Sequence, residues 1–517
     1  MTGILAASPL DRLTDPFGSF PALLRDWAEA QPGKAALDDG ERCLGWGELG
    51  AQVERLAARL QADGLVRGQA VAILGTSTAG YALAYLAAIR AGGCAAPLTT
   101  SASPGQLAGM LADSGAIHLF IDAPKLAELE GEADFAVPPG VSVVMLENLA
   151  AFMAPPGTAA APFEPREADP FNIIYSSGTT GAPKGIVHSH GMRWHQVAAR
   201  AAMSYGPDAR TLLSTPLYSN TTLAAFLPTL FTGGFVSIMG KFSVERWLER
   251  AERQRITHAM LVPVQYQRLL AYEGFDRFDL SALRAKFSTS APFSAELKRE
   301  ALRRMPGGLT EYYGMTEGGV TCILHAHQFP EKLHTVGQPA AGHELKVIDE
   351  AGHELPQGEA GELVGRSRVM MLGYHGQPEK TAEGYWNDAE GRRWQRMGDV
   401  GRVDPDGFVE LVGRTKDMII SGGFNIYPVD LETQLLKDPR VAEAAVIGVP
   451  SADWGETPVG FVVLQGAGEE ALEDIRQTAN AKLGKTQRLS RLLALEELPR
   501  SHIGKLLKTN LREMVGE

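Results

Sequence analysis

Cysteine is scarce in this sequence. Three cysteines, Cys43, Cys94 and Cys322, are spread over 517 residues. Their spacing matches neither the paired ligands of a zinc site nor the framework of a small disulfide-bonded domain. We therefore expect neither kind of cross-link, and the composition favours a reducing, cytoplasmic location.

Long apolar runs are missing as well. The most notable one, over residues 82–89, is much shorter than the roughly 20 residues that cross a bilayer. The chain does not begin with a basic segment followed by a long apolar stretch, so the sequence predicts neither a signal peptide nor an integral membrane segment. We find no internal repeat or low-complexity tract.

Positive charge is not in excess. Lysine and arginine number 49 against 61 aspartate and glutamate residues, which gives a formal net charge of −12. Because nucleic-acid backbones are bound by clustered lysine and arginine, this balance disfavours a nucleic-acid partner. A single nucleotide can still bind, since a local group of donors is enough. The length predicts about three domains, and the 44% hydrophobic content indicates a globular chain with a sizeable core.

Helix and strand patterns alternate through the first part of the chain. The expected helices cover residues 23–30, 46–62 and 79–91, and a further helix is opened by Ser103 with Pro104 and Gln106 as a capping pattern. The expected strands cover residues 71–74, 94–98, 117–121, 171–174, 212–215, 258–262 and 285–288. Such alternation is typical of parallel sheets that are covered by helices on both faces.

The pattern changes after residue 336. Short β-like runs at residues 345–348, 362–364 and 408–412 are separated by Gly, Pro and Asp, which indicates a small antiparallel sheet or barrel. A helix from residue 428, strands at 442–449 and 459–464 and a helix at 470–483 follow. We therefore predict an α/β fold. A large N-terminal domain (1–415) holds two wound α/β sheet units and a small β-barrel-like unit, and a small mobile α+β domain (416–517) follows.

A loop rich in glycine and hydroxyl groups is the strongest functional signal. The stretch Tyr175-Ser-Ser-Gly-Thr-Thr-Gly-Ala-Pro-Lys-Gly185 supplies backbone N–H groups, hydroxyl donors and one mobile cation, which together suit a polyphosphate. Its order differs from the common P-loop, which places Gly directly before Lys and Ser or Thr after it. An ordinary flexible turn is the alternative interpretation.

The order of this loop resembles the phosphate loop of the AMP-forming acyl-adenylating enzymes, which include acyl-CoA synthetases, peptide-synthetase adenylation domains and luciferases. The resemblance implies that the loop binds the β- and γ-phosphates of ATP. The residues concerned are Ser176, Ser177, Gly178, Thr179, Thr180, Gly181 and Lys184.

The stretch Tyr312-Tyr-Gly-Met-Thr-Glu317 is similar to a second motif of this family. The resemblance implies that Tyr313 stacks on adenine, Thr316 hydrogen-bonds the α-phosphate and Glu317 holds Mg²⁺. A single carboxylate fits this last role, because Mg²⁺ keeps several waters and often takes one or two carboxylates plus phosphates. A tight turn with a surface glutamate is the alternative.

Two further motifs follow in the family's order. In Gly398-Asp399 the resemblance assigns Asp399 to the ribose hydroxyls, and in Gly413-Arg414 it assigns Arg414 to the ribose or a phosphate. Met397 stands where the family usually has Thr, which removes a hydroxyl but leaves the role of Asp399 intact.

The resemblance also covers the C-terminal region. Lys416 falls at the family's hinge, and Gly422-Gly423 matches a loop that would let the pantetheine arm of CoA pass. The stretch Pro499-Arg-Ser-His-Ile-Gly-Lys505 is similar to the motif that carries the mobile catalytic lysine, here Lys505, with Ser501 in place of Thr.

The acyl pocket is less clearly marked. We expect it to include Tyr218, Ser219 and Gly318, with residues 218–224, 264–266, 290–292 and 318–322 as lining segments. Few charges occur there, which favours a fatty or other apolar acid, with an aryl acid second. Many family members carry His where this chain has Ser219. The nearby His188, His190 and His195 lack carboxylate or Cys partners in the sequence, so we interpret them as ordinary polar residues.

Taken together, the resemblance implies an ATP-dependent carboxylic acid:CoA ligase. Lys505, Thr316 and Glu317 would be catalytic, and ATP, Mg²⁺ and CoA would be the cofactors. An acyl-adenylate would form with release of pyrophosphate, and a thioester would then form with release of AMP, after the C-terminal domain turns about Lys416. A homodimer is one assembly that is compatible with the sequence.

Several alternatives stay open. The acid could be aryl or another small acid, or the chain could be a stand-alone adenylating enzyme that loads a carrier protein. An amino-acid adenylating unit would need an acidic residue near Tyr218, and none is there. Nothing in the sequence indicates the oxygen chemistry of a luciferase. A regulator without catalytic activity would be expected to lose Lys505 or Glu317, and both are present.

Overall fold

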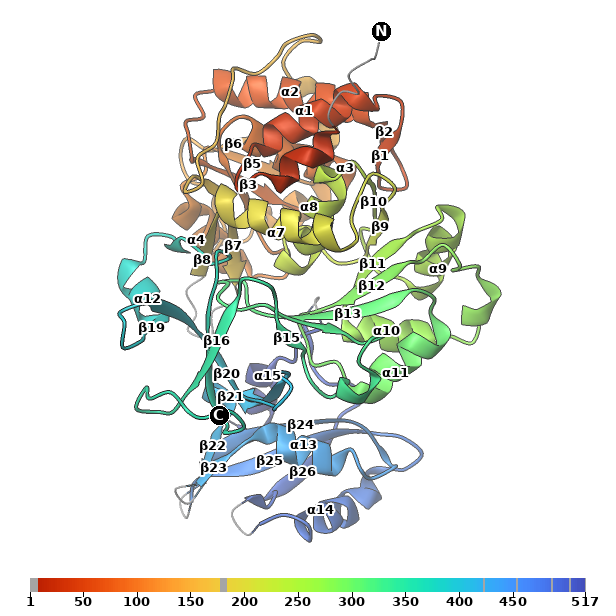
Figure 1. Cartoon of the computed structure of the whole chain (residues 1–517), viewed down its shortest axis with the longest axis vertical. Helices are drawn as coiled ribbons and strands as arrows, with labels where there is room; N and C mark the ends of the chain where they lie inside the picture. The colour runs from red at the N-terminus through yellow and green to blue at the C-terminus, as the bar shows by residue number, and fades with distance from the viewer. Residues whose placement is uncertain are drawn as a thin grey trace.

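The computed structural model describes residues 8–176, 184–421, 424–451, 454–484, 487–501 and 504–516. Figure 1 shows the N-terminal α/β part at the top, a strand-rich middle region and the C-terminal unit at the bottom. The predicted residues Ser177, Gly178, Thr179, Thr180, Gly181, Gly422 and Gly423 lie outside the described ranges.

The first large sheet has seven strands in the order β18-β8-β7-β4-β3-β5-β6. They are β3 (Ala70–Leu74), β4 (Cys94–Pro97), β5 (His118–Ile121), β6 (Ser142–Met145), β7 (Pro170–Ser176), β8 (Lys184–Ser189) and β18 (Gly373–Tyr374). Strands β3 to β7 are parallel, as predicted, whereas β8 and β18 add antiparallel strands at one edge. Ser176 pairs with Lys184, so the glycine-rich stretch joins the paired ends of two neighbouring strands.

The second large sheet has nine strands in the order β15-β14-β13-β12-β11-β9-β10-β1-β2. They are β1 (Ala35–Asp38), β2 (Cys43–Gly45), β9 (Arg210–Leu213), β10 (Phe235–Ile238), β11 (His258–Leu261), β12 (Ala285–Ser288), β13 (Gly308–Tyr313), β14 (Cys322–His325) and β15 (Gln338–Pro339). The central strands are parallel and both edges are antiparallel. The second wound unit predicted from the sequence is therefore confirmed.

Helices cover these sheets. The longer ones are α1 (Phe20–Ala30), α2 (Trp46–Ala62), α3 (Ala79–Arg90), α4 (Pro104–Ser114), α7 (His190–Met203), α8 (Asn220–Phe231), α9 (Val244–Arg253), α10 (Pro263–Leu270) and α11 (Ala295–Arg304). The shorter ones are α5 (Ala123–Leu129), α6 (Leu149–Phe152) and α12 (Pro378–Glu383), with 3₁₀ turns at Pro9–Thr14, Leu146–Asn148, Phe275–Arg277 and Pro330–Lys332. The capping pattern predicted at Ser103 is present, with reciprocal hydrogen bonds between Ser103 and Gln106.

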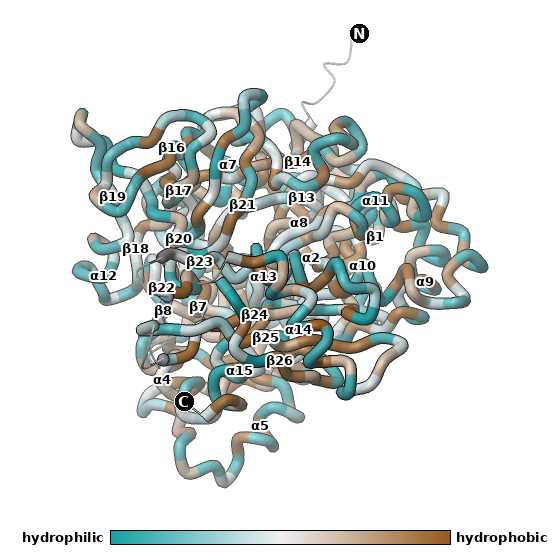
Figure 2. The backbone as a smooth tube through the Cα atoms, turned by 90° about the horizontal axis from the view of Figure 1, so that it is seen from below, coloured by the Kyte–Doolittle hydropathy of each residue, from teal (hydrophilic) through white to brown (hydrophobic). Residues whose placement is uncertain are grey.

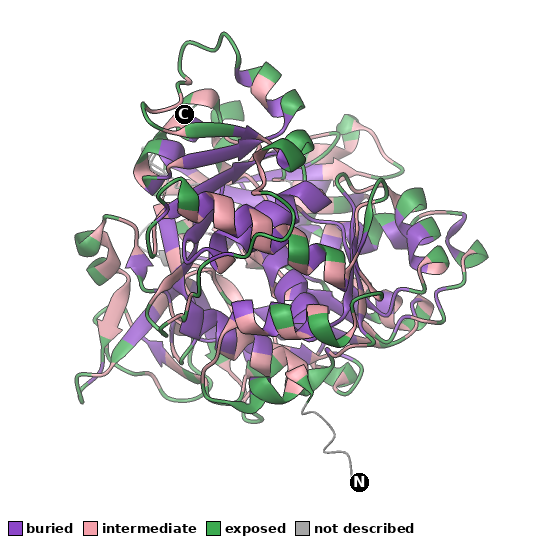
Figure 3. Ribbon diagram, turned by 90° about the horizontal axis from the view of Figure 1, so that it is seen from above, coloured by how far each residue is buried: buried purple, intermediate pink, exposed green. Residues whose placement is uncertain are grey.

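The main core joins both large sheets. Helices α3 and α8 are apolar around most of their circumference, so burial on all sides is the stable arrangement for them. Their side chains pack in one cluster with residues of both sheets, such as Ile73, Phe171, Leu213 and Val236. Figure 3 shows the same division, with buried strands inside and exposed residues on the outer helices and loops.

The outer helices are amphipathic by comparison. Helix α9 alternates hydrophobic and hydrophilic residues (Figure 2) and buries Trp247 and Leu248 on its inner face. None of the helices in the described ranges has the length and apolar content that crossing a membrane requires.

A small antiparallel sheet follows. It consists of β16 (Glu344–Ile348), β17 (Gly361–Arg366), β19 (Tyr385–Asn387), β20 (Arg393–Val403) and β21 (Val409–Arg414). The three strands predicted in this region are present. In the register of β20 and β21, Asp399 lies opposite Arg414, which brings together two residues that the sequence had singled out.

The C-terminal unit is an α+β structure. Its five strands are β22 (Ile419–Ser421), β23 (Phe424–Ile426), β24 (Val441–Ser451), β25 (Gly455–Leu464) and β26 (Arg491–Ala494). Its helices are α13 (Pro428–Leu435), α14 (Leu472–Asn480) and α15 (Lys508–Met514), with a 3₁₀ turn at Glu469–Ala471. The division predicted after residue 415 falls within the 3₁₀ turn η5 (Thr415–Asp417), between β21 and β22. The helix expected over 470–483 is shorter, because its first turn is 3₁₀ and it ends at Asn480.

Candidate active site

Asp399 is the centre of one polar group. Its Oδ1 accepts a hydrogen bond from Nε of Arg414 at 2.9 Å, and its Oδ2 accepts one from the hydroxyl of Tyr313 at 2.8 Å. Burial works against the charge of Arg414, but the adjacent carboxylate outweighs it and raises the pKa of the guanidinium. Burial and the same carboxylate raise the pKa of Tyr313 well above its usual value. Tyr313 therefore remains a hydrogen-bond donor. The three residues predicted to bind the nucleotide, Asp399, Arg414 and Tyr313, are thus connected by hydrogen bonds.

Glu317 lies in a second group, beyond the end of β13. Its Oε1 accepts a hydrogen bond from the hydroxyl of Tyr374 at 2.9 Å. The ammonium of Lys184, the first residue of β8, lies 5.6 Å from the centre of the Tyr374 ring. Lys184 and Glu317, which the sequence analysis named separately, are thus linked through a residue that it missed.

Thr316 is held through its backbone. Its carbonyl accepts a hydrogen bond from Nε2 of His188 at 2.7 Å, while Nδ1 of His188 lies 2.8 Å from Nη2 of Arg193 and 3.1 Å from Nδ2 of Asn172. Burial, and then the charge of Arg193, lower the pKa of His188 well below its usual value. A neutral His188 therefore donates to Thr316 and accepts from the other two side chains.

This series of hydrogen bonds through His188 fixes the turn that carries Thr316 and Glu317. His188 is thus engaged by other protein groups. In the described part of the chain, no three or more His, Cys, Asp or Glu side chains lie together as a group that could hold a metal ion. The sequence analysis missed the supporting role of His188. Its position in a strand directly after the phosphate loop was the available signal.

Lys505 lies near Asp399 and Arg414 of the first polar group. Its side chain is exposed, although surrounding atoms remove part of its hydration, and this desolvation lowers its pKa. The positive charges of Arg414 and Lys416 lower the pKa further. The preceding Gly504 has φ +76°, and a methyl group there would lie 3.1 Å from Cγ1 of Val264. The turn before Lys505 thus contacts the N-terminal part of the molecule at α10.

Positive charge is concentrated around this region. Burial, and then the charge of Arg414, lower the pKa of Lys416, and Lys184 adds to the effect. Lys184, Arg414, Lys416 and Lys505 are thus linked by electrostatic repulsion, with Asp399 and Asp417 as the nearby carboxylates. Crowded cations of this kind suit an anionic ligand, which would relieve their repulsion.

The residues expected at the acyl pocket are only partly brought together. The hydroxyls of Thr221 and Ser290 hydrogen-bond to each other, which joins two of the expected lining segments. Ser290 has φ +81°, an uncommon conformation for a residue other than glycine. Ser219 is buried and caps α8, accepting a hydrogen bond from the backbone N–H of Thr221 at 3.3 Å. Tyr218 is half-buried.

Gly318 is required by close backbone packing. It has φ +87°, and a methyl group there would lie 2.0 Å from the carbonyl oxygen of Val369. Gly318 also pairs with Met370 in an isolated bridge. Only glycine fits this contact, which holds the segment after Glu317 against the one that leads to Tyr374.

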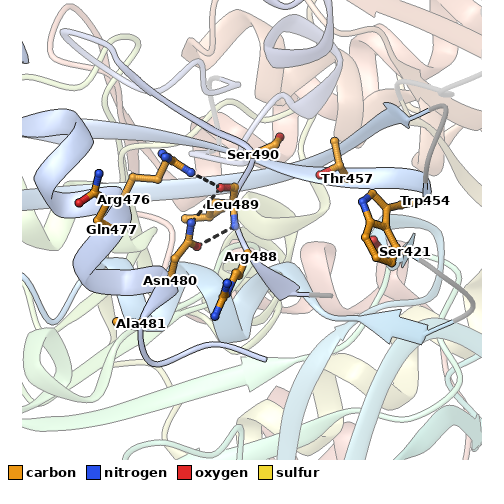
Figure 4. Close-up of a pocket in the computed structure, with 10 residues that line it drawn as sticks. All are labelled: Ser421, Trp454, Thr457, Arg476, Gln477, Asn480, Ala481, Arg488, Leu489 and Ser490. Atoms are coloured by element: carbon orange, nitrogen blue, oxygen red, sulfur yellow. Dashed lines mark hydrogen bonds between the residues drawn. The ribbon is translucent and has the colours of Figure 1, made fainter. Parts of the chain in front are cut away.

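A cavity of about 570 Å³ lies in the C-terminal unit (Figure 4). It is lined by Ser421, Trp454, Thr457, Arg476, Gln477, Asn480, Ala481, Arg488, Leu489 and Ser490. Arg476 is occupied by Glu473 and the carbonyl of Leu489, whereas exposed Arg488 has no hydrogen-bond or ion-pair partner among the described residues. In Figure 1 the adjoining α14 lies at the end of the molecule away from the N-terminal part.

Most of the chain can be matched to known proteins. Residues 24–375 match the family model described as AMP-binding enzyme, and residues 430–505 match that of the AMP-binding enzyme C-terminal domain. This chain belongs to the AMP-binding enzyme family. The resemblance noted in the sequence and the predicted fold class are thereby confirmed.

Named relatives of this AMP-binding enzyme cover nearly its full length. A feruloyl-CoA synthase from Amycolatopsis sp. is 35% identical over 503 residues, covering 95% of this chain and 97% of that protein. An indoleacetate–CoA ligase from Aromatoleum aromaticum is 31% identical over 528 residues, covering 95% and 98%. ATP-bound MatB from Rhodopseudomonas palustris has a TM-score of 0.85 at 29% identity, covering 96% and 99%. The predicted enzyme class, an AMP-forming acid–thiol ligase, is confirmed by these relatives.

Proposed function

We propose that this AMP-binding enzyme is an ATP-dependent ligase that joins an aryl carboxylic acid to CoA. The observation that carries the proposal is the convergence of Asp399, Arg414 and Glu317 with Lys184 and Lys505 in one region. These residues come from five separate motifs of the sequence. A purely structural cluster would not require so many mutually repelling cations close together.

ATP would lie across the two polar groups, the one around Asp399 and the one around Glu317. Asp399 would accept the ribose hydroxyls, with Arg414 beside it and the ring of Tyr313 against adenine. The glycine-rich loop, from Ser176 to Lys184, would hold the outer phosphates.

The donor set fits a magnesium ion bound with ATP. Glu317 is a single carboxylate that uses one oxygen toward Tyr374, and Mg²⁺ takes few protein ligands when phosphates complete its shell. When bound, Mg²⁺ would neutralise negative charge on the phosphates. Glu317 would hold it, and the hydroxyl of Thr316, which has no hydrogen-bond partner among the described residues, is available to the α-phosphate.

In the first half-reaction, a carboxylate oxygen of the acid would attack the α-phosphorus of ATP. The new P–O bond forms as the bond to pyrophosphate breaks, which gives an acyl-adenylate. Such transfers depend mainly on positioning and on offsetting charge. The ammonium of Lys505 would supply a positive charge beside the carboxylate and the α-phosphate.

In the second half-reaction, the thiolate of CoA would attack the acyl carbon and release AMP. The C-terminal unit would turn about Lys416, withdraw Lys505 and bring the Gly422-Gly423 loop to the adenylate. The cavity beside Ser421 would turn with it. Arg488, which lacks a protein partner in the described ranges, would then be available to a CoA phosphate.

The sequence alone favoured a fatty acid, with an aryl acid second. The named relatives now favour the aryl acid, because two of them act, by their names, on ferulate and indoleacetate. Half-buried Tyr218, one of the residues expected at the acyl pocket, would offer an aromatic ring to such an acid. A fatty acid remains the second candidate.

A panel of acids in an ATP–pyrophosphate exchange assay tests the proposal. Hydroxycinnamic and arylacetic acids should support exchange better than octanoic or malonic acid, and CoA should then release AMP. Preference for a dicarboxylate would exclude an apolar pocket. Release of AMP by a carrier-protein thiol but not by CoA would instead favour a stand-alone carrier-loading enzyme.

A further inference from the structure

Tyr374 joins three segments that are far apart in the sequence. It lies in β18, which pairs with β8 so that Tyr374 faces Ile186, two residues after Lys184. Its hydroxyl reaches Glu317, which follows β13 in the other large sheet. One side chain therefore contacts the residue that ends the phosphate loop and the carboxylate expected to hold a metal ion.

We propose that Tyr374 is a positioning residue that orients the Glu317 carboxylate for a magnesium–nucleotide ligand. The proposal rests on the function proposed above, because it concerns the same site. The 2.9 Å hydrogen bond goes to Oε1, and within the described ranges no other group donates to this carboxylate. Oε2 is left for a cation. Second-shell hydrogen bonds of this kind fix the rotation of a ligating carboxylate.

The backbone around Tyr374 is fixed on both sides. The N–H groups of Leu372 and His375 donate to the carbonyls of Val187 and Gly185 at 2.8 and 2.7 Å. The N–H of Tyr374 donates to the hydroxyl of Thr381 at 2.9 Å. The backbone that carries the phenol is thereby held by β8 and by Thr381.

The segment before Tyr374 is also tied to Glu317. The N–H of Met371 donates to the carbonyl of Glu317 at 2.8 Å, and Gly318 is packed against the backbone of Val369. Both the backbone and the carboxylate of Glu317 are therefore held by residues 369–374. If the Tyr374 hydroxyl were lost, the backbone would stay in place and only the carboxylate would be free to rotate.

The chemistry of the phenol suits this task. A tyrosine hydroxyl carries its proton at neutral pH, so the hydroxyl of Tyr374 acts as a donor to Glu317. The face of the ring lies toward the Lys184 ammonium. A cation over an aromatic ring is attracted electrostatically, so the ring also favours a position of Lys184 beside Glu317.

The two contacts can be separated by substitution. Tyr374→Phe removes the hydrogen bond to Glu317 and keeps the ring, whereas Tyr374→Leu removes both. Tyr385→Phe is the matched control, because Tyr385 lies in β19, at the other end of α12, and its ring contacts Arg393. Circular dichroism would check that each variant is folded.

The experiment is calorimetric binding of ATP to the full chain over a series of MgCl₂ concentrations, without acid. In Tyr374→Phe the MgCl₂ concentration for half-maximal tightening of ATP binding should rise about tenfold, in line with the loss of an outer-shell partner. Affinity for ATP without Mg²⁺ should stay unchanged in Tyr374→Phe and fall in Tyr374→Leu. Adding Tyr374→Phe to Glu317→Gln should cause no further change.

An unchanged magnesium dependence in Tyr374→Phe, or an equal change in Tyr385→Phe, would overturn the proposal. Absence of ATP binding in the unmodified chain would instead overturn the proposed function. The two failures are thus distinguished within one set of measurements.

Discussion

Arg414 and Asp399 face each other across two antiparallel strands, with Nε of the arginine 2.9 Å from Oδ1 of the aspartate. Both residues come from motifs that mean little in isolation. Their pairing leaves the carboxylate oriented by the guanidinium on one side and the Tyr313 hydroxyl on the other. A rigid acceptor for two neighbouring hydroxyl groups results.

Asp399→Asn should therefore raise KM for ATP strongly. The loss of charged hydrogen bonds to ribose costs about 1.5–3 kcal/mol, or roughly 10–100-fold in affinity. Tyr313→Phe should change KM for ATP less, because the ring that would contact adenine is kept. Steady-state kinetics with saturating acid and CoA measure both values.

Glu410→Gln serves as the control for Asp399→Asn. Glu410 pairs with Arg402 across the same two strands, with Nε of the arginine 2.8 Å from the carboxylate, but on the exposed part of the sheet. Its substitution should leave KM for ATP unchanged. If Glu410→Gln and Asp399→Asn had equal effects, Asp399 would be acting only through the stability of the sheet.

Lys505→Ala should separate the two half-reactions. Loss of one positioned charge lowers acyl-adenylate formation by about 10²–10³. Thioester formation from supplied acyl-adenylate and CoA should be retained, because Lys505 is withdrawn in that step. Single-turnover assays of each half-reaction test this, and an equal loss in both would refute the proposed turning of the C-terminal unit.

The pH dependence of adenylation should reflect the same lysine. Desolvation and the neighbouring cations lower the pKa of Lys505 from its usual 10.5. The ammonium is present below this lowered pKa and is lost as pH rises through it. Adenylation should therefore decline at a pH below 10.5, while thioester formation from supplied adenylate should lack this decline. The pH profiles of the two half-reactions provide the measurement.

Much of the fold could be predicted because local patterns and tertiary packing agree. A helix was predicted over residues 79–91, where α3 lies, and the capping residues at Ser103 marked the start of α4. The strand before the phosphate loop was also predicted. The antiparallel strand β18 was not, since it depends on pairing between residues far apart in the sequence, Tyr374 and Ile186. Strand β8 was not predicted either, although it pairs with β7, which lies just before it in the chain.

The residues of the candidate site also divide into those that the sequence predicted and those that it did not. Residues within short motifs, such as Glu317, Asp399 and Lys505, could be named from the sequence. Tyr374 and His188 could not, because their roles arise only where separate strands meet. Supporting contacts made through tertiary structure leave little trace in local spacing.

His190 should make the protein less stable in acid. It is buried among Phe20, Phe163 and Phe171, and neither ring nitrogen has a partner among the described residues. Burial lowers its pKa from 6.5 to about 4. The unfolded chain therefore binds a proton first as pH falls, and the free energy of unfolding decreases between about pH 6.5 and 4, by up to about 3 kcal/mol.

His190→Leu should remove this part of the acid sensitivity. Urea unfolding at pH 7 and pH 4.5 gives the two free energies, and their difference should be smaller in the variant. Exposed His353→Gln is the control and should keep the difference of the unmodified chain. Equal differences in all three proteins would contradict a buried neutral His190.

Arg488 provides the last test, because it lies in the C-terminal cavity, has no described protein partner and is absent from the ATP-binding group. If it contacts a CoA phosphate, Arg488→Ala should raise KM for CoA about tenfold, as expected for one charged hydrogen bond. ATP–pyrophosphate exchange, which needs no CoA, should be unaffected. Arg491→Ala, a change at another exposed arginine in β26, is the matched control.

A comparison with dephospho-CoA identifies the phosphate. If Arg488 binds the 3′-phosphate, the variant and the unmodified chain should have similar KM values for the dephosphorylated form. An effect of Arg488→Ala on pyrophosphate exchange would show that the cavity serves the first half-reaction instead.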